Sequence, residues 1–142
     1  MEIESVDEVD LSNWDLHRAA VENRADIAKI LIEKGADIEA KDADGCTPLH
    51  AAAWDNSLEF TRLIVNSGAD IEATDDDADT PLHMAAWKNS VEVATFLLES
   101  GANLDAKDEG GRTPLERANA NNHPYSQATD VARLISEFRP IK

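Results

Sequence analysis

The sequence has few of the residues that cross-link a chain or insert it into a membrane. Its single cysteine, Cys46, excludes an internal disulfide and a thiolate zinc site, and it favours a reducing, cytoplasmic location. Aromatic residues make up only 5% of the chain. No apolar run is long enough to predict a signal peptide or a membrane span, so we expect neither.

Basic residues are also scarce. Lys and Arg number 13 against 29 Asp and Glu, and the formal net charge is -16. Nucleic acids and anionic membrane surfaces both need clustered basic side chains, so neither is expected as a partner. The negative charge would attract a basic partner, or it simply keeps a small protein soluble, and the composition leaves both explanations open.

What the chain does contain is a motif that recurs every 33 residues. Thr47–His50, with the sequence Thr-Pro-Leu-His, returns as Thr80–His83 and, with Glu in place of His, as Thr113–Glu116. A fixed period of this length indicates one supersecondary unit that is copied and stacked. Two further features keep the same interval, namely glycines and pairs of alanines: Gly35, Gly68 and Gly101, and the pairs that begin at Ala19, Ala52 and Ala85.

Residues repeated in this way are the pattern of ankyrin repeats, and the chain resembles an ankyrin-repeat protein over residues 13–138. The resemblance implies an all-α solenoid of four stacked helix–turn–helix repeats, with β-hairpin-like fingers at 37–46, 70–79 and 103–112. The outer two repeats should act as caps, because each lacks a neighbour on one side. The expected segments are an acidic lead-in (1–12), repeats at 13–41, 42–74, 75–107 and 108–138, and a C-terminal tail (139–142).

Local signals predict where the helices of each repeat begin and end. Thr47 and Thr80 are N-cap candidates, and the proline after each suits the first helical position. Each second helix should end next to a glycine, which can adopt positive φ. The last repeat carries an insertion of about five residues near Pro124. The expected second helices are 25–34, 58–67, 91–100 and 129–138.

Two departures from the family pattern fall in the fingers. The finger turn expects a glycine with positive φ, and Gly45 and Gly111 supply it, whereas Ala78 stands at the equivalent position. If φ stays positive there, alanine should cost about 1 kcal/mol. The resemblance also implies a finger asparagine that is hydroxylated in some members. That modification is not available here, because the matching residues are Glu39, Glu72 and Asp105.

Three side-chain pairs or clusters could carry chemistry, and each has a simpler structural explanation. His50 and His83 lie on neighbouring repeats, too far apart to share a metal ion, and the resemblance implies that they bond to backbone and to the motif threonine. The aspartates of 75–79 lack the order of a calcium loop and should form a solvated acidic finger.

Cys46 and His50 have the spacing of a helical pair that could form a thiolate, but Cys46 falls at a variable finger position. There is also no glycine-rich phosphate loop. We therefore expect no catalytic, metal-binding or cofactor-binding residue.

The clearest functional signal is a pair of tryptophans. Trp54 and Trp87 each follow the motif threonine by seven residues, at the end of a first helix that lines the concave side in the family. Tryptophan is enriched at binding hot spots, although these two could also be packing residues that cover the motif helices. The predicted partner-binding residues are Trp54, Asp55, Trp87 and Lys88, with Asp44, Asp76, Asp77, Asp79, Glu109 and Arg112 on the fingers.

These features predict a non-enzymatic, monomeric module that binds a basic and apolar surface of another protein. Acidic fingers would steer the partner, and the tryptophans would supply apolar contact. The alternative is an ankyrin-type inhibitor or regulatory subunit of an enzyme such as a protein kinase, by analogy only. An engineered binder is a third possibility, and the irregular caps and Ala78 argue against an idealised consensus design.

Overall fold

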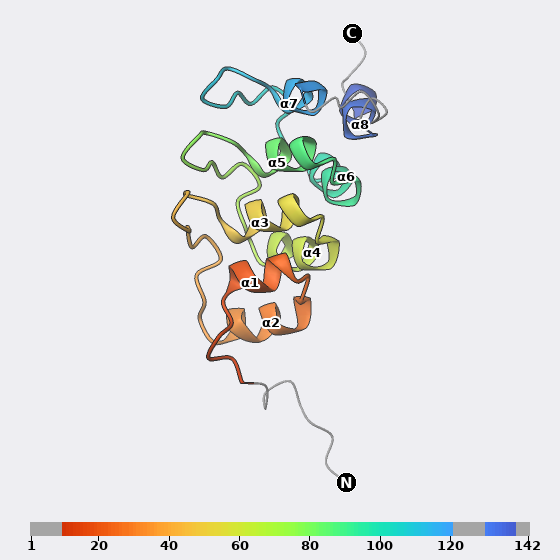
Figure 1. Ribbon diagram of the computed structural model, residues 1–142. Coiled ribbons are helices and arrows are strands. Elements are labelled where there is room, and N and C mark those ends of the chain that lie inside the picture. The colour runs from red at the N-terminus through yellow and green to blue at the C-terminus, as the bar shows by residue number, and fades with distance from the viewer. Residues whose placement is uncertain (1–9, 121–129, 139–142) are drawn as a thin grey trace.

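The computed structural model describes residues 10–120 and 130–138, and within these ranges it contains eight helices and no strand. The odd-numbered helices stack in one layer and the even-numbered helices in a second, and the finger loops project from the first layer (Figure 1). The all-α solenoid of helix pairs is therefore confirmed. The helices are α1 (Leu16–Val21), α2 (Ala25–Glu33), α3 (Pro48–Asp55), α4 (Leu58–Asn66), α5 (Pro81–Lys88), α6 (Val91–Glu99), α7 (Pro114–Ala120) and α8 (Asp130–Phe138).

The predicted boundaries of the second helices hold to within one residue where the structure describes them. The expected second helices at 25–34, 58–67 and 91–100 each end one residue earlier, and the residue left over is the C-cap. Most of the lead-in (1–9), the inserted segment with Pro124 (121–129) and the tail (139–142) lie outside the described residues. None of the described helices combines the length and the apolar character needed to cross a bilayer.

The fingers have the shape of tight turns and, in the described chain, form no β-ladder. The Asp42 amide donates to the Cys46 carbonyl at 3.0 Å and the Gly45 amide to the Asp42 carbonyl at 3.0 Å. The equivalent bonds in the next finger run from Asp75 to the Asp79 carbonyl and from Ala78 to the Asp75 carbonyl. A hairpin-like turn therefore closes each finger without strands on either side.

The motif threonine and histidine form a capping box at the start of α3. The Thr47 hydroxyl accepts from the His50 amide at 3.4 Å, and His50 Nδ1 accepts from the Thr47 amide at 3.1 Å. The imidazole thus does the work of the usual Glu or Gln at this position. Thr80 and His83 repeat the arrangement at α5.

The same histidines join neighbouring repeats. Because Nδ1 of His50 accepts a hydrogen bond, the ring proton is on Nε2, which donates to the Asp79 carbonyl at 2.8 Å. His83 reaches the Arg112 carbonyl at 2.8 Å, and burial lowers the pKa of both rings and keeps them neutral. The structural role predicted for the two histidines is confirmed.

An asparagine ladder, which the sequence analysis missed, forms a second link between repeats. Asn23, Asn56 and Asn89 follow the first helices with φ near 55°, at 52°, 55° and 54°. Each side-chain oxygen accepts from a backbone amide at the start of the next repeat's second helix, at 3.0–3.1 Å. The signal was available, because the three asparagines keep the 33-residue interval.

The sequence separation of the bonds in this ladder gives the length of the insertion in the last repeat. The bonds from Phe60 to Asn23 and from Val93 to Asn56 span 37 residues each, whereas the bond from Val131 to Asn89 spans 42. The geometry at both ends is the same, so five extra residues lie between them. The insertion predicted from the sequence alignment therefore has the expected length.

The core consists of small residues between the layers and larger ones within the second layer. The alanine pairs that begin at Ala19, Ala52 and Ala85 are fully buried and allow the first helices to approach closely. Phe60, Ile64 and Leu97 are also fully buried and fill the space between the helix pairs. Because every repeat contributes only one face to this core, stability depends on the contacts between repeats.

Two acidic residues of the fingers form hydrogen bonds between repeats. Glu39 Oε2 accepts from the Asp70 amide at 2.7 Å, and Glu72 Oε2 accepts from the Asn103 amide at 2.8 Å. Each bond crosses from one repeat to the next. These carboxylates therefore add negative charge between repeats and also hold the repeats together.

Ala78 has a φ of 62°, as its position predicts, beside 77° for Gly45 and 78° for Gly111. Replacing Ala78 with Gly should raise the free energy of unfolding by about 1 kcal/mol, because the left-handed conformation is strained for alanine. Gly111→Ala is the matched control, since its new Cβ would meet nothing within 4 Å. Urea denaturation should show the two substitutions changing stability in opposite directions, and a destabilised Ala78→Gly protein would contradict this explanation.

Candidate partner-binding groove

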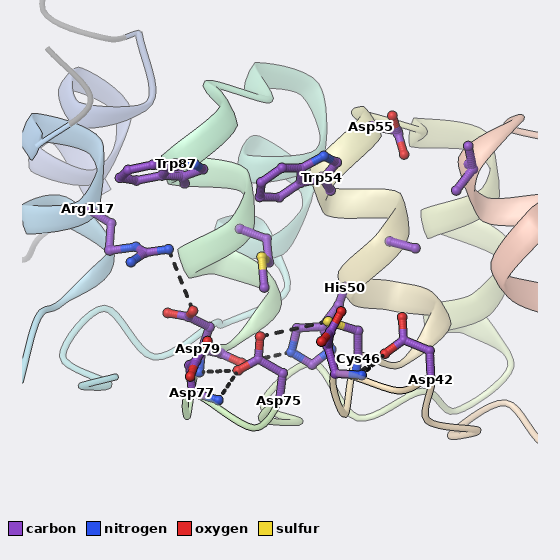
Figure 2. Close-up of a pocket in the computed structure, with 14 residues that line it drawn as sticks. Asp42, Cys46, His50, Trp54, Asp55, Asp75, Asp77, Asp79, Trp87 and Arg117 are labelled. Atoms are coloured by element: carbon purple, nitrogen blue, oxygen red, sulfur yellow. Dashed lines mark hydrogen bonds and ion pairs between the residues drawn. The ribbon is translucent and has the colours of Figure 1, made fainter. Parts of the chain in front are cut away.

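An open groove of about 510 Å³ runs along the first-helix layer beside the fingers. Its residues come from α1, α3, α5 and α7 and from two finger loops, so the stacking of repeats creates it. Figure 2 shows the two indoles along one edge and the finger aspartates along the other. The lining residues are Val21, Asp42, Asp44, Cys46, His50, Ala51, Trp54, Asp55, Asp75, Asp77, Asp79, Met84, Trp87 and Arg117.

The two tryptophans occupy equivalent positions and differ in exposure. Trp54 in the last turn of α3 is 42% exposed, whereas Trp87 in α5 is half-buried. A cation from the following repeat lies over each ring: Lys88 Nζ is 4.8 Å from the Trp54 ring centroid, and Arg117 Cζ is 4.5 Å from that of Trp87. Both distances are within the range of cation–π attraction.

Three aspartates at the 33-residue interval build the finger turns. Oδ1 of Asp42 accepts from two backbone amides of its own turn, and Asp75 and Asp108 do the same, all at 2.9–3.0 Å. The sequence analysis did not single out Asp42 or Asp108 and assigned Asp75 only to a solvated run. Their regular spacing, together with the tendency of aspartate to bond to backbone two residues on, was the available signal.

The carboxylates around the groove are largely unneutralised. In the described part of the chain, no Lys or Arg lies within 4.0 Å of the carboxylate of Asp42, Asp44, Asp55, Asp75 or Asp77. The one Lys or Arg among the groove residues is Arg117, and it is already paired with Asp79 and Asp108. The groove therefore combines an apolar, aromatic edge with a surplus of negative charge.

Asp79 differs from the expectation of a solvated finger residue, because it is only 3% exposed. Its Oδ2 lies 3.6 Å from Arg117 Nη2, and Asp108 Oδ2 lies 3.7 Å from Arg117 Nη1. The sequence analysis missed this cluster, since Arg117 comes from a different repeat. Arg112 also contacts this cluster from the exposed side, with Nε 3.4 Å from Asp108 Oδ2.

The predicted partner-binding residues are divided between the groove, an adjacent hollow and the surface outside both. Trp54, Asp55, Trp87, Asp44 and Asp77 line the groove, and Lys88 covers the Trp54 ring. Glu109 and Arg112 line an adjacent hollow with Asp77, Asp79, Asp108, Gly110 and Arg117. Asp76 is exposed outside both, and its amide donates to the Asp44 carbonyl at 3.0 Å, which ties one finger to the next.

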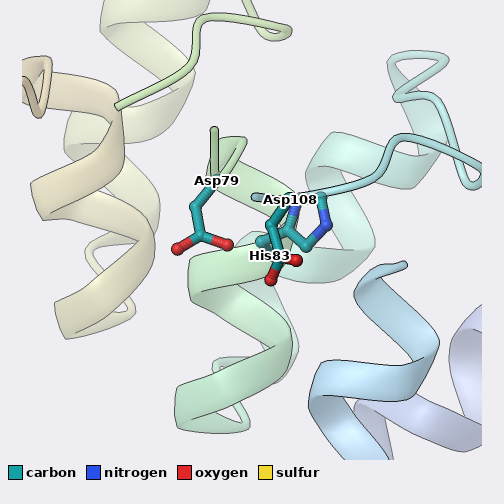
Figure 3. A group of neighbouring side chains, drawn as sticks. All are labelled: Asp79, His83 and Asp108. Carbon is teal, nitrogen blue, oxygen red and sulfur yellow. The ribbon is translucent and has the colours of Figure 1, made fainter. Parts of the chain in front are cut away.

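The potential metal-ligand atoms of Asp79, His83 and Asp108 lie within 4.8 Å of one another. Figure 3 shows the three side chains as neighbours. However, His83 uses Nδ1 for Thr80 and Nε2 for the Arg112 carbonyl, so neither nitrogen is left for a metal. The guanidinium of Arg117 supplies the positive charge that the two carboxylates face. The arrangement is a buried ion cluster between the third and fourth repeats.

Burial raises the pKa of Asp79 to about 6; Arg117 opposes the shift, and the neighbouring Asp75 and Asp108 add to it. Asp108 is different: burial would raise its pKa, but the hydrogen bond from the Arg112 amide and the charges of Arg112 and Arg117 outweigh burial, and the pKa is lowered. In the described chain Asp79 Oδ1 has no hydrogen-bond partner. The charged form of Asp79 is therefore the poorly compensated member of the cluster.

Cys46 lacks the properties of a nucleophile. Burial first, and then the charges of Asp42, Asp75 and Asp44, raise its pKa to about 12, so the thiol stays protonated. His50 cannot activate it, because both ring nitrogens bond to Thr47 and to the Asp79 carbonyl. The Cys46–His50 pair thus has no catalytic geometry.

Relative to the wild type, the Asp79→Asn protein should become more stable as pH rises. A folded pKa of about 6, above the unfolded value, means that Asp79 contributes stability at low pH that is lost as pH rises through about 6. Asparagine removes this loss, so the difference in free energy of unfolding between variant and wild type should rise by about 2 kcal/mol from pH 4 to pH 7.5. Urea denaturation at both pH values measures it, and a pH-independent difference would show that Asp79 is compensated in its charged form.

Comparison with known families agrees with this architecture. Residues 12–75 match the family model described as ankyrin repeats (3 copies), and residues 77–109 match the one described as ankyrin repeat. Together the matches span about two thirds of the chain. Among curated proteins no significant match was found.

Proposed function

Since the chain belongs to the ankyrin-repeat family, whose repeats are protein–protein interaction modules, we propose that it holds a partner protein in the groove beside its fingers. The proposed activity is binding, without catalysis. One observation carries the choice of surface: two tryptophans and several unpaired aspartates converge on the same open groove. A partner that fits it presents basic and apolar side chains together.

The proposed mechanism has an electrostatic step and a contact step. Asp44, Asp76, Asp77 and Glu109 are exposed on successive fingers and attract a basic segment. Trp54 and Trp87 then bury apolar surface against the partner, with Asp55 and Lys88 at the rim. Asp79 and Arg112 act indirectly in this scheme, because they belong to the ion cluster that positions Arg117 at the end of the groove.

The surface is held rigid before the partner arrives. Fingers are bonded to one another through the Asp76 amide and the Asp44 carbonyl at 3.0 Å, and through the Glu109 amide and the Asp77 carbonyl at 2.8 Å. Each finger base is also held by a histidine of the preceding repeat, as at the Asp79 carbonyl. Binding therefore requires little ordering of the groove, which lowers its entropic cost.

Replacing Trp54 and Trp87 with Ala should raise the dissociation rate of a captured partner by roughly 30-fold or more, because hot-spot truncations cost about 2 kcal/mol or more. Affinity capture with mass spectrometry identifies the partner, and surface plasmon resonance measures the rate. Phe96→Ala is the matched control, since this aromatic also carries a cation, Arg62 at 5.4 Å, but lies in the second layer. If the double variant instead loses thermal stability and shows no specific binding defect, the tryptophans are core residues and not contact residues.

Added salt should lower the rate at which the partner associates, because it screens the charges of the fingers. Raising NaCl from about 50 mM to about 500 mM should slow association by about tenfold or more and change dissociation by less than about twofold. Neutralising Asp76 and Glu109 to Asn and Gln should reduce this salt dependence. Neutralising Glu33 and Glu99, which change the net charge equally in the second layer, should affect it less. An association rate that does not change with salt concentration would rule out electrostatic steering of the partner by the fingers.

A further inference from the structure

We propose that the groove recognises an arginine of the partner, with its side chain against Trp54 and its guanidinium among the aspartates of the two fingers that line the groove. This inference rests on the proposed function and names the residue type that the groove selects. It depends on three observations about the groove: its uncompensated charge, the different state of the two indoles, and its apolar floor.

The carboxylates at the α1 and α3 end of the groove favour a cationic side chain of the partner. Arg117 lies at the α7 end and is held between Asp79 and Asp108, so it neutralises none of the other groove carboxylates. Towards the α1 and α3 end, Asp42, Asp44 and Asp55 have no Lys or Arg within 4.0 Å in the described chain. A partner side chain placed there must be positive, since a neutral one would leave the carboxylates desolvated and unpaired.

The two indoles differ in how firmly their cations are held. Arg117, over Trp87, has a side chain only 13% exposed and is paired with two buried carboxylates, so it stays in place. Lys88, over Trp54, is exposed, and in the described chain no carboxylate lies within 4.0 Å of it. Lys88 can therefore leave at little cost. Trp54 is the indole available to a cation from outside.

Arginine fits this end of the groove better than lysine. Its planar guanidinium donates to carboxylates in a fixed fork while its stem lies along the indole, whereas the lysine ammonium is a compact and strongly hydrated charge. Val21, Ala51 and Met84 line the same groove and would cover the methylene stem. The aspartates that approach this end come from separate fingers, and the several donors of a guanidinium can reach more than one of them.

The experiment selects peptides from a displayed random library on the intact protein and keeps those that fail to bind the Trp54→Ala/Trp87→Ala protein. Enriched peptides should share an arginine next to an apolar residue. Isothermal titration then compares each peptide with versions in which arginine is replaced by lysine or by citrulline, the neutral isostere. Citrulline should weaken binding by about tenfold or more and lysine by about threefold or more, since charge-assisted bidentate contacts are lost.

Protein variants test where the guanidinium lies. Lys88→Gln should tighten arginine peptides by roughly two- to fivefold, because it removes a competing cation from Trp54. Asp44→Asn with Asp77→Asn should weaken them by about fivefold or more. The matched control, Glu33→Gln with Glu99→Gln, changes the net charge equally in the second layer and should alter affinity by less than about twofold at the same ionic strength.

The outcomes separate this inference from the proposed function. Enriched peptides that need the tryptophans but lack arginine, or that keep their affinity with citrulline, overturn the arginine assignment and leave the groove as the binding surface. Weaker binding to Lys88→Gln also overturns it, since Lys88 would then be a contact. If no peptide distinguishes the wild type from the double tryptophan variant, both the assignment and the proposed surface fail.

Discussion

A histidine ring fixes the base of each described finger to the repeat before it. His17, His50 and His83 place Nε2 2.7–2.8 Å from the carbonyls of Cys46, Asp79 and Arg112, each 29 residues further along the chain. In the two complete motifs the other ring nitrogen accepts from the motif threonine. The bond needs a neutral ring with its proton on Nε2, and burial, which lowers the pKa, provides one. The positions of the groove aspartates that lie on the fingers depend on this link.

The fourth repeat carries a glutamate where the preceding repeats carry the histidine. Glu116 replaces the histidine, and its carboxylate accepts from the Thr113 amide and hydroxyl, both at 3.1 Å. The helix is therefore capped as in the other repeats, but among the described residues the Glu116 side chain makes no bond to a neighbouring repeat. A carboxylate can cap its own helix, whereas a link to a neighbouring carbonyl needs a donor that a carboxylate lacks.

Acidic side chains have three distinct roles in a chain that is strongly negative. Some form turns or join repeats, as Asp42 and Glu39 do through backbone amides. Asp79 and Asp108 are buried around Arg117. A third group, which includes Asp44 and Asp77, remains exposed and unpaired in the described chain beside the groove. Composition alone could not separate these roles, because the residue type is the same in all of them.

Sequence reasoning succeeded where a feature was local or periodic. The capping threonines, the helix ends and the positive φ of Ala78 follow from neighbouring residues and were predicted. The links of Asn23, Asn56 and Asn89 were periodic too, but the interval alone does not show that their side chains accept from the next repeat. The burial of Asp79 was predicted wrongly, since it depends on an arginine 38 residues away that stands outside the repeated motif.

The 33-residue period by itself determined the architecture, because each unit can bury its apolar face only against a copy of itself. It also determined that Trp54 and Trp87 occupy equivalent positions. Only the tertiary structure decided that the surroundings of the two indoles differ. Arg117 is held over Trp87 by two buried carboxylates, whereas Lys88 lies over Trp54 without an ion pair in the described chain. That difference arises from side chains of neighbouring repeats, and a repeat pattern does not specify which charges meet across an interface.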